Sequence, residues 1–74
     1  MTTQELRVYL SDRYTVRFGS TWDAVSHNFL DTVGLFDLVT GRFVARSHGL
    51  ELHDALQVAY DCHIARRASR PGAK

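Results

Sequence analysis

The chain has a single cysteine, Cys62, among its 74 residues, so no internal disulfide can hold its fold together. A chain of this length buries only about 60% of the surface that its unfolded form exposes, which is enough for one modest hydrophobic core. The composition, with 45% hydrophobic and 23% charged residues, is typical of a folded globular domain. We therefore expect one domain, residues 1–67, followed by a flexible basic tail, residues 68–74.

Residues 6–18 predict a β-hairpin, because apolar side chains alternate with polar ones on both sides of a polar segment at 11–13. A three-residue turn places the apolar side chains on one face: Leu6, Val8, Leu10, Tyr14, Val16 and Phe18. Thr2 and Glu5 have the spacing of a capping box, which would instead begin a helix. The alternation outweighs that signal, and the sequence predicts the hairpin.

Residues 20–33 change to a helical period. Trp22, Val25, Phe29 and Val33 form an apolar stripe, and Gly34 is a stop signal, so we expect a helix over residues 21–32. A tryptophan at the start of such a stripe belongs to the core of so small a domain. Replacing Trp22 with alanine is then predicted to cost roughly 3 kcal/mol of stability.

Residues 35–46 predict a second hairpin around Thr40-Gly41, and residues 51–67 predict a second helix. In the hairpin, the more apolar face is expected to form the core, with Phe36, Leu38, Phe43 and Ala45. In the helix, the apolar stripe consists of Leu52, Ala55, Leu56, Ala59, Tyr60 and His63.

The two halves of the chain resemble each other, since residues 11–17 align with 40–46 and residues 22–25 align with 53–56. Duplication and chance similarity both explain matches this short. In either case each half has one apolar sheet face and one apolar helix stripe. The sequence therefore predicts an α+β fold in which two ββα units form a four-stranded antiparallel sheet, with two helices packed on one face.

The face of this sheet that the helices leave free is the predicted working surface. By the register above it carries Arg7, Tyr9, Arg17, Arg42, Val44 and Arg46. Arginines beside apolar side chains suit contact with a protein or nucleoprotein partner. We expect a small non-enzymatic binding protein, a regulator or inhibitor of the kind that phages and mobile elements encode. A homodimer through the free sheet edge is an open alternative.

The charge distribution supports a second hypothesis, direct binding of nucleic acid. Residues 1–61 carry five arginines and eight acidic residues, a net charge of −3, whereas residues 62–74 carry +4. The basic residues of this second segment are Arg66, Arg67, Arg70 and Lys74. They would contact phosphates while the sheet face stacks on bases, although only Tyr9 is an aromatic residue there by this register.

Catalysis and metal binding find little support in the sequence. The four histidines are His27, His48, His53 and His63. Their spacing is not that of metal ligands, and no cluster of cysteines or carboxylates accompanies them. Cys62 and His63 are neighbours on the predicted helix and point about 100° apart, so they do not form a nucleophile and its base. We expect no catalytic residue, no metal and no cofactor. No apolar segment is long enough for a membrane span, and a cytoplasmic location is expected.

Overall fold

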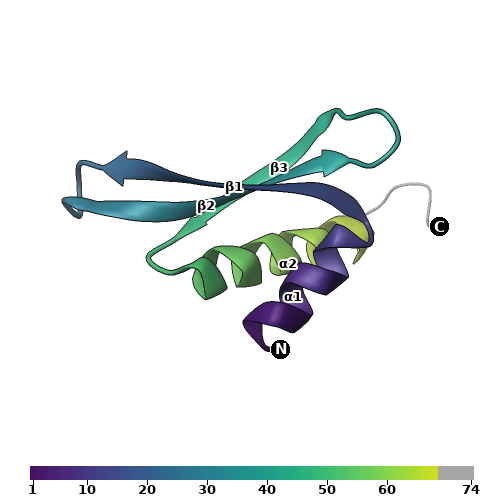
Figure 1. Ribbon diagram of the computed structural model, residues 1–74, viewed down its shortest axis with the longest axis horizontal. Coiled ribbons are helices and arrows are strands. Elements are labelled where there is room, and N and C mark those ends of the chain that lie inside the picture. Colours follow the sequence, from purple (N-terminus) through teal and green to yellow (C-terminus); the bar gives the residue numbers. More distant parts are fainter. Residues whose placement is uncertain (69–74) are drawn as a thin grey trace.

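The computed structural model describes residues 1–68, which form two helices and three strands. These are α1 (Thr3–Ser11), β1 (Tyr14–Asp23), β2 (Asn28–Asp37), β3 (Phe43–Gly49) and α2 (Leu52–Ala68). The strands form one antiparallel sheet in the order β1-β2-β3, and both helices lie on the same side of it (Figure 1). The predicted α+β class and antiparallel sheet are confirmed. The predicted number of strands is wrong, because the sheet has three strands and not four.

α1 occupies the segment in which the sequence predicted the first strand. Its start is the capping box: the Thr2 hydroxyl accepts from the Glu5 N–H at 3.1 Å, and the Glu5 carboxylate accepts from the Thr2 N–H at 2.8 Å. Leu6 and Leu10 are fully buried. The predicted hairpin over 6–18 is wrong because these leucines, four residues apart, share a helical face as readily as a strand face.

The predicted helix over 21–32 is also wrong, since this segment contains the end of β1, a turn and the start of β2. Asp23 holds the turn by accepting hydrogen bonds from the backbone N–H groups of Val25 and Ser26 and from the Ser26 hydroxyl. Trp22 and Phe29 are direct cross-strand partners in the hairpin. Their seven-residue separation equals two helical turns, and this coincidence produced the apparent helical stripe.

The hairpin around Thr40-Gly41 is confirmed as the connection between β2 and β3. The Asp37 carboxylate accepts from the N–H groups of Val39 and Thr40, both at 2.8 Å, and Gly41 has a positive φ of 72°. The predicted core face of this hairpin is wrong. Leu35 is buried against the helices, whereas Leu38 and Phe43 are exposed.

α2 and its apolar stripe are confirmed, with Ala55, Leu56, Ala59 and His63 buried against the sheet and α1. The predicted ββα repeat is wrong because residues 22–25 lie at the end of β1 and its turn, while the matching residues 53–56 are helical. The core joins α1, α2 and β2 through Leu6, Leu10, Val33, Leu35, Ala55, Leu56 and Ala59.

Candidate binding surface

The side of the sheet that faces away from α1 and α2 is covered by no other element of residues 1–68, and we call it the open face (Figure 1). Alternation along each strand and the pairing register assign its residues. They are Thr15, Arg17, Gly19 and Thr21 on β1, Asn28, Leu30, Thr32, Gly34 and Phe36 on β2, and Phe43, Arg46 and His48 on β3. Along the described strands, the only acidic residue with the same parity is Asp23, at the far tip of the β1–β2 hairpin.

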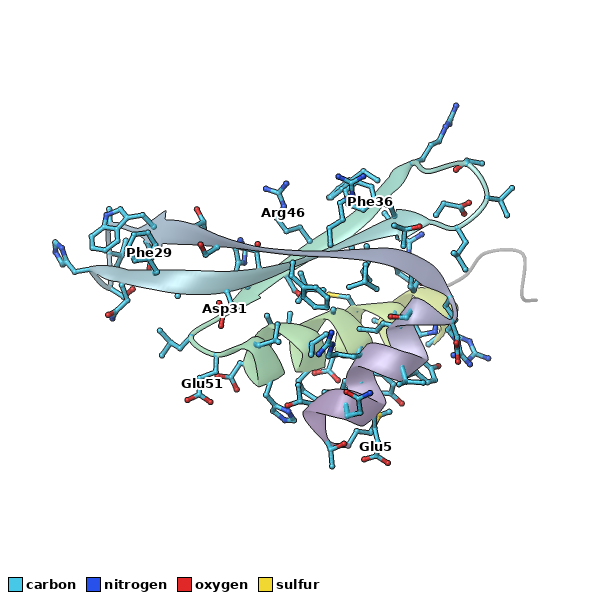
Figure 2. All side chains as sticks on the ribbon, viewed as in Figure 1. Glu5, Phe29, Asp31, Phe36, Arg46 and Glu51 are labelled. Atoms are coloured by element: carbon cyan, nitrogen blue, oxygen red, sulfur yellow. The ribbon has the colours of Figure 1, made fainter. Side chains whose placement is uncertain are left out.

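Arg17 and Arg46 lie on opposite sides of the same glycine. Gly34 in the central strand pairs with Arg17 on β1 and with Arg46 on β3, so the three residues form a row across the sheet. Figure 2 shows Arg46 and Phe36 projecting from the sheet away from the helices. Because residue 34 is a glycine, it places no side chain of its own between the two arginines.

Gly34 also makes room for the aromatic ring of Phe36. A Cβ atom at position 34 would lie 3.1 Å from Cε1 of Phe36, so the ring leans over the glycine along the surface of the sheet. The Arg17 guanidinium carbon lies 5.5 Å from the centre of this ring, within the range of a cation–π contact. The ring of Phe36 therefore lies over Gly34, with the Arg17 guanidinium near it.

A β-bulge brings a second aromatic ring to the open face. Leu35 pairs with Ala45, but Phe36 pairs with Phe43, so Val44 is an extra residue in β3. Val44 and Ala45 both pack against the core, and the chain then returns Phe43 to the side of Phe36. The two phenylalanine rings meet edge to face with centroids 5.8 Å apart, and Phe43 is 59% exposed.

An open pocket of about 440 Å³ lies beside these groups. It is lined by both arginines and Phe36 together with a segment of β1 and the two small residues of β2: Arg17, Phe18, Gly19, Ser20, Thr21, Thr32, Gly34, Phe36 and Arg46. None of the acidic residues in the described part of the chain contributes to the lining. The open face therefore combines two arginines, two aromatic rings and a polar hollow.

The structure brings together only part of the predicted sheet-face set. Arg17 and Arg46 share the open face as predicted, and Arg42 lies in the β2–β3 loop next to it. The predicted position of Val44 on the free face is wrong, because the bulge turns its side chain toward the core.

Arg7 and Tyr9 are not on the sheet, because residues 3–11 are helical. Arg7 lies over the ring of Phe18 at 5.3 Å, and Tyr9 packs against Tyr60 with ring centroids 5.0 Å apart. Their assignment to the free sheet face is wrong. The sequence prediction assigned Phe36 and Phe43 to the core because their face of the hairpin is the more apolar one. The bulge at Val44, which no residue pattern indicates, instead places Ala45 on the opposite face from both rings.

The alternative nucleic-acid set divides between described and undescribed parts of the chain. Arg66 and Arg67 lie in the last turn of α2, while Arg70 and Lys74 lie outside the described residues. Within residues 1–68, no three His, Cys, Asp or Glu side chains gather as a metal site would require. Neither described helix has the length and apolar character needed to cross a membrane.

Comparisons with known proteins found no matching family model, no matching curated protein and no matching solved structure. The function is therefore inferred from the geometry and chemistry of the surface itself.

Proposed function

We propose that this protein binds single-stranded nucleic acid on the open face of its sheet. The observation that supports this most is the placement of Phe36 and Phe43 beside Arg17 and Arg46, on a surface that neither α1 nor α2 covers. Sheet surfaces that bind single strands combine exposed aromatic rings with basic groups in this way.

Each group has a separate role in this proposal. Phe43, the more exposed ring, stacks on one base, and the ring of Phe36 offers a second stacking surface over Gly34. Stacking on an aromatic side chain is worth about 1–3 kcal/mol per base and tolerates any base. Arg17 and Arg46 are placed to contact the phosphates on both sides of that path, with bidentate hydrogen bonds.

An acidic protein segment is the rival occupant, because the same arginines would attract it. The sequence favoured a protein partner on the ground that a nucleic-acid platform needs two or three aromatic residues and only Tyr9 qualified. The open face instead carries two phenylalanine rings in contact with each other. That feature favours stacked bases over carboxylates, which gain nothing from a phenyl face.

Fluorescence anisotropy with a labelled single-stranded oligonucleotide tests the proposal. Arg46→Glu should weaken binding by about tenfold, since one phosphate contact is lost and a repulsive charge is added. Arg7→Glu is the matched control, because it makes the same charge change on α1, away from the open face. It should weaken binding by no more than about threefold.

The variant Phe43→Ala distinguishes binding of single-stranded nucleic acid from binding of an acidic protein segment. Loss of about tenfold in oligonucleotide affinity, with a clear preference for single over double strands, supports the proposal. Equal effects of Arg46→Glu and Arg7→Glu, or the absence of binding at low salt, would overturn it. Tighter binding of a poly-glutamate peptide than of the oligonucleotide, unaffected by Phe43→Ala, would assign the face to an acidic protein.

A further inference from the structure

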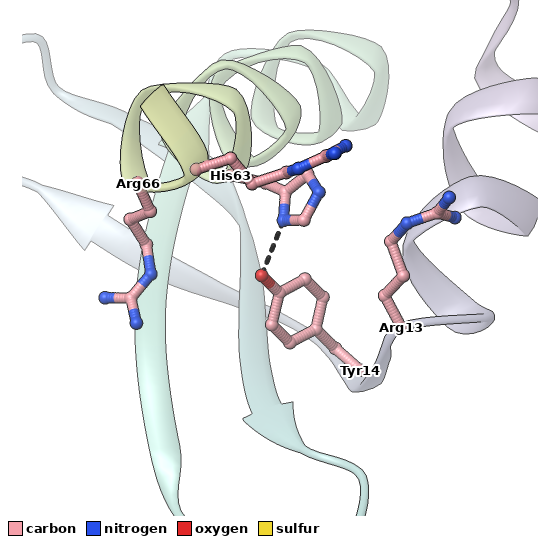
Figure 3. Close-up of a pocket in the computed structure, with 5 residues that line it drawn as sticks. Arg13, Tyr14, His63 and Arg66 are labelled. Atoms are coloured by element: carbon pink, nitrogen blue, oxygen red, sulfur yellow. Dashed lines mark hydrogen bonds between the residues drawn. The ribbon is translucent and has the colours of Figure 1, made fainter. Parts of the chain in front are cut away.

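A second cluster of basic residues lies where the C-terminal end of α2 approaches the junction of α1 and β1. A pocket of about 520 Å³ opens there, lined by Arg13, Tyr14, His63, Arg66 and Arg67. Figure 3 shows the rings of Tyr14 and His63 between Arg66 on one side and Arg13 on the other. No acidic residue of the described chain lines this pocket.

A hydrogen-bonded pair of polar side chains, the half-buried Tyr14 and the buried His63, lines the pocket. The Tyr14 hydroxyl and His63 Nδ1 are joined by a hydrogen bond of 2.6 Å, although His63 is only 7% exposed. The second ring nitrogen, Nε2, is buried and has no hydrogen-bond partner among the described residues. A buried polar atom without a partner is costly, and such atoms in folded proteins call for a specific reason.

The arginines around this pair differ in how firmly they are held. Arg13 donates a hydrogen bond to the Tyr9 carbonyl oxygen at 3.0 Å, and its guanidinium carbon lies 3.7 Å from the centre of the Tyr9 ring. This fixes Arg13 in place while leaving further N–H groups of its guanidinium available. Within residues 1–68, the side chains of Arg66 and Arg67 make no hydrogen bond or ion pair.

The three arginines are close enough to affect the pKa of His63 electrostatically. Burial lowers the pKa of His63 below its ordinary value, and the charges of Arg67, Arg13 and Arg66 lower it further. Cations in the last turn of a helix are favoured by the helix dipole, which explains Arg66 and Arg67 in part. That effect does not explain Arg13, which belongs to another segment and brings a third positive charge to the same place.

We propose that this pocket binds a phosphate group. A phosphate offers several oxygen acceptors to guanidinium groups, which bind them in bidentate fashion, and its negative charge relieves the mutual repulsion of the three arginines. The pocket is independent of the proposed function on the open face, since the two share no residue. Inorganic phosphate, a nucleotide and the phosphate of a nucleic acid all present this same chemistry.

NMR titration of the whole chain with sodium phosphate, against sodium chloride at equal ionic strength, tests the proposal. The ring signals of His63 should shift in a saturable manner, with a dissociation constant on the order of 1 mM. The double variant Arg66→Gln, Arg67→Gln should weaken binding by about tenfold or more. The matched control, Arg17→Gln with Arg46→Gln, removes the same number of charges from the open face and should leave phosphate binding unchanged.

The two proposals can fail separately. The open-face control variant should lose oligonucleotide binding while it keeps the phosphate response at His63. A phosphate response that does not saturate, or one that is the same in the Arg66→Gln, Arg67→Gln variant, would overturn the phosphate pocket. Circular dichroism of each variant shows whether the fold is retained.

Comparing the binding of a mononucleotide with that of its nucleoside shows whether the pocket recognises phosphate alone or a whole nucleotide. Adenosine monophosphate should bind at least as tightly as inorganic phosphate, and adenosine should not bind at His63. Affinity for the monophosphate that exceeds that for phosphate by about tenfold or more would extend the site to the nucleotide itself. Equal shifts of the His63 signals with adenosine and with its monophosphate would overturn the proposal.

Discussion

The two faces of the same sheet have opposite characters, although their residues alternate along the same strands. In β2, Val33 and Leu35 are 0% and 1% exposed beneath the helices, while their neighbours Gly34 and Phe36 belong to the open face. Where the helices cover it, the helix side is mainly apolar and buried, whereas the open face presents guanidinium groups and aromatic rings. Successive residues of one strand thus divide between the core and the proposed binding surface.

The acidic side chains also lie mostly away from the open face. Three carboxylates cap turns or a helix start, where hydrogen bonds hold each pKa below its ordinary value. Glu5 accepts from the Thr2 N–H, Asp23 from Ser26, and Asp37 from the N–H groups of Thr40 and Val39. These positions leave the central part of the open face to its arginines, so an overall charge near zero still yields a basic surface.

The sharpest test of this comparison replaces two adjacent residues of β2. Leu35→Ala removes a fully buried side chain from the core and should cost about 3 kcal/mol of unfolding free energy, a large part of what so small a domain possesses. Phe36→Ala removes a larger side chain from the open face, and it should cost about 1 kcal/mol. Urea denaturation followed by circular dichroism measures both.

Binding should show the reverse order for these two variants. At low urea and low temperature, where both remain folded, Phe36→Ala should lose oligonucleotide affinity and Leu35→Ala should keep it. If Phe36→Ala proved as destabilising as Leu35→Ala, the open face would be part of the core and the division between the faces would not hold.

The parts of the fold that the sequence predicted correctly are those in which several local signals agree. Residues 35–46 contain a turn with Thr40-Gly41, and residues 51–67 carry an apolar stripe too long for a strand. In the N-terminal half, short patterns fit two structures equally well: Leu6 and Leu10 suit a helix as well as a strand. The capping box of Thr2 and Glu5 is the local signal that indicates the helix, and the alternation of the following residues outweighs it in the sequence. Tertiary contacts of α1 with α2 and β1 bury both leucines.

The sequence predicts those residues of the candidate site whose strand keeps its regular alternation of side chains between the two faces. Arg17 alternates with Val16 in any strand that begins near Tyr14, so its place on the open face follows despite the wrong partner strand. Arg46 follows in the same way from Ala45. Regular alternation from Ala45 predicts Phe43 in the core, whereas the bulge at Val44 places Phe43 on the open face.

A smaller effect on the unfolding free energy, and one that depends on pH, is expected from His63 at the end of α2. The pKa of His63 is lowered in the folded protein by burial and by the neighbouring arginines, whereas in the unfolded chain it is about 6.5. As the pH falls below about 6.5, the unfolded chain takes up a proton that the folded protein resists. The unfolding free energy should therefore decrease on acidification in this range and should be unaffected above it.

Two variants attribute this pH dependence to His63. Tyr14→Phe leaves Nδ1 of the buried His63 ring without its partner and should cost about 1.5 kcal/mol at neutral pH. His63→Gln should flatten the change in unfolding free energy between pH 7 and pH 5. A wild-type slope that persists in His63→Gln would show that other groups cause it.

The smallest effect is expected at the tip of the β1–β2 hairpin, where the helix-side register continues beyond the helices. Trp22 has the same parity as Val16 and Phe18, yet it is 52% exposed, and Phe29 opposite it is 68% exposed. Its contacts are edge-to-face with Phe29 at 5.1 Å and with His27 at 6.4 Å.

Trp22→Ala should therefore cost no more than about 1 kcal/mol, the value of a cross-strand aromatic pair, and not the roughly 3 kcal/mol expected of a core residue. Urea denaturation followed by circular dichroism measures the difference, with Phe29→Ala as the partner variant. The double variant should cost less than the sum of the two single variants, because both remove the same contact. A loss of about 3 kcal/mol for Trp22→Ala alone would mean that parity in the strand, and not cover by a helix, determines which residues stabilise this fold.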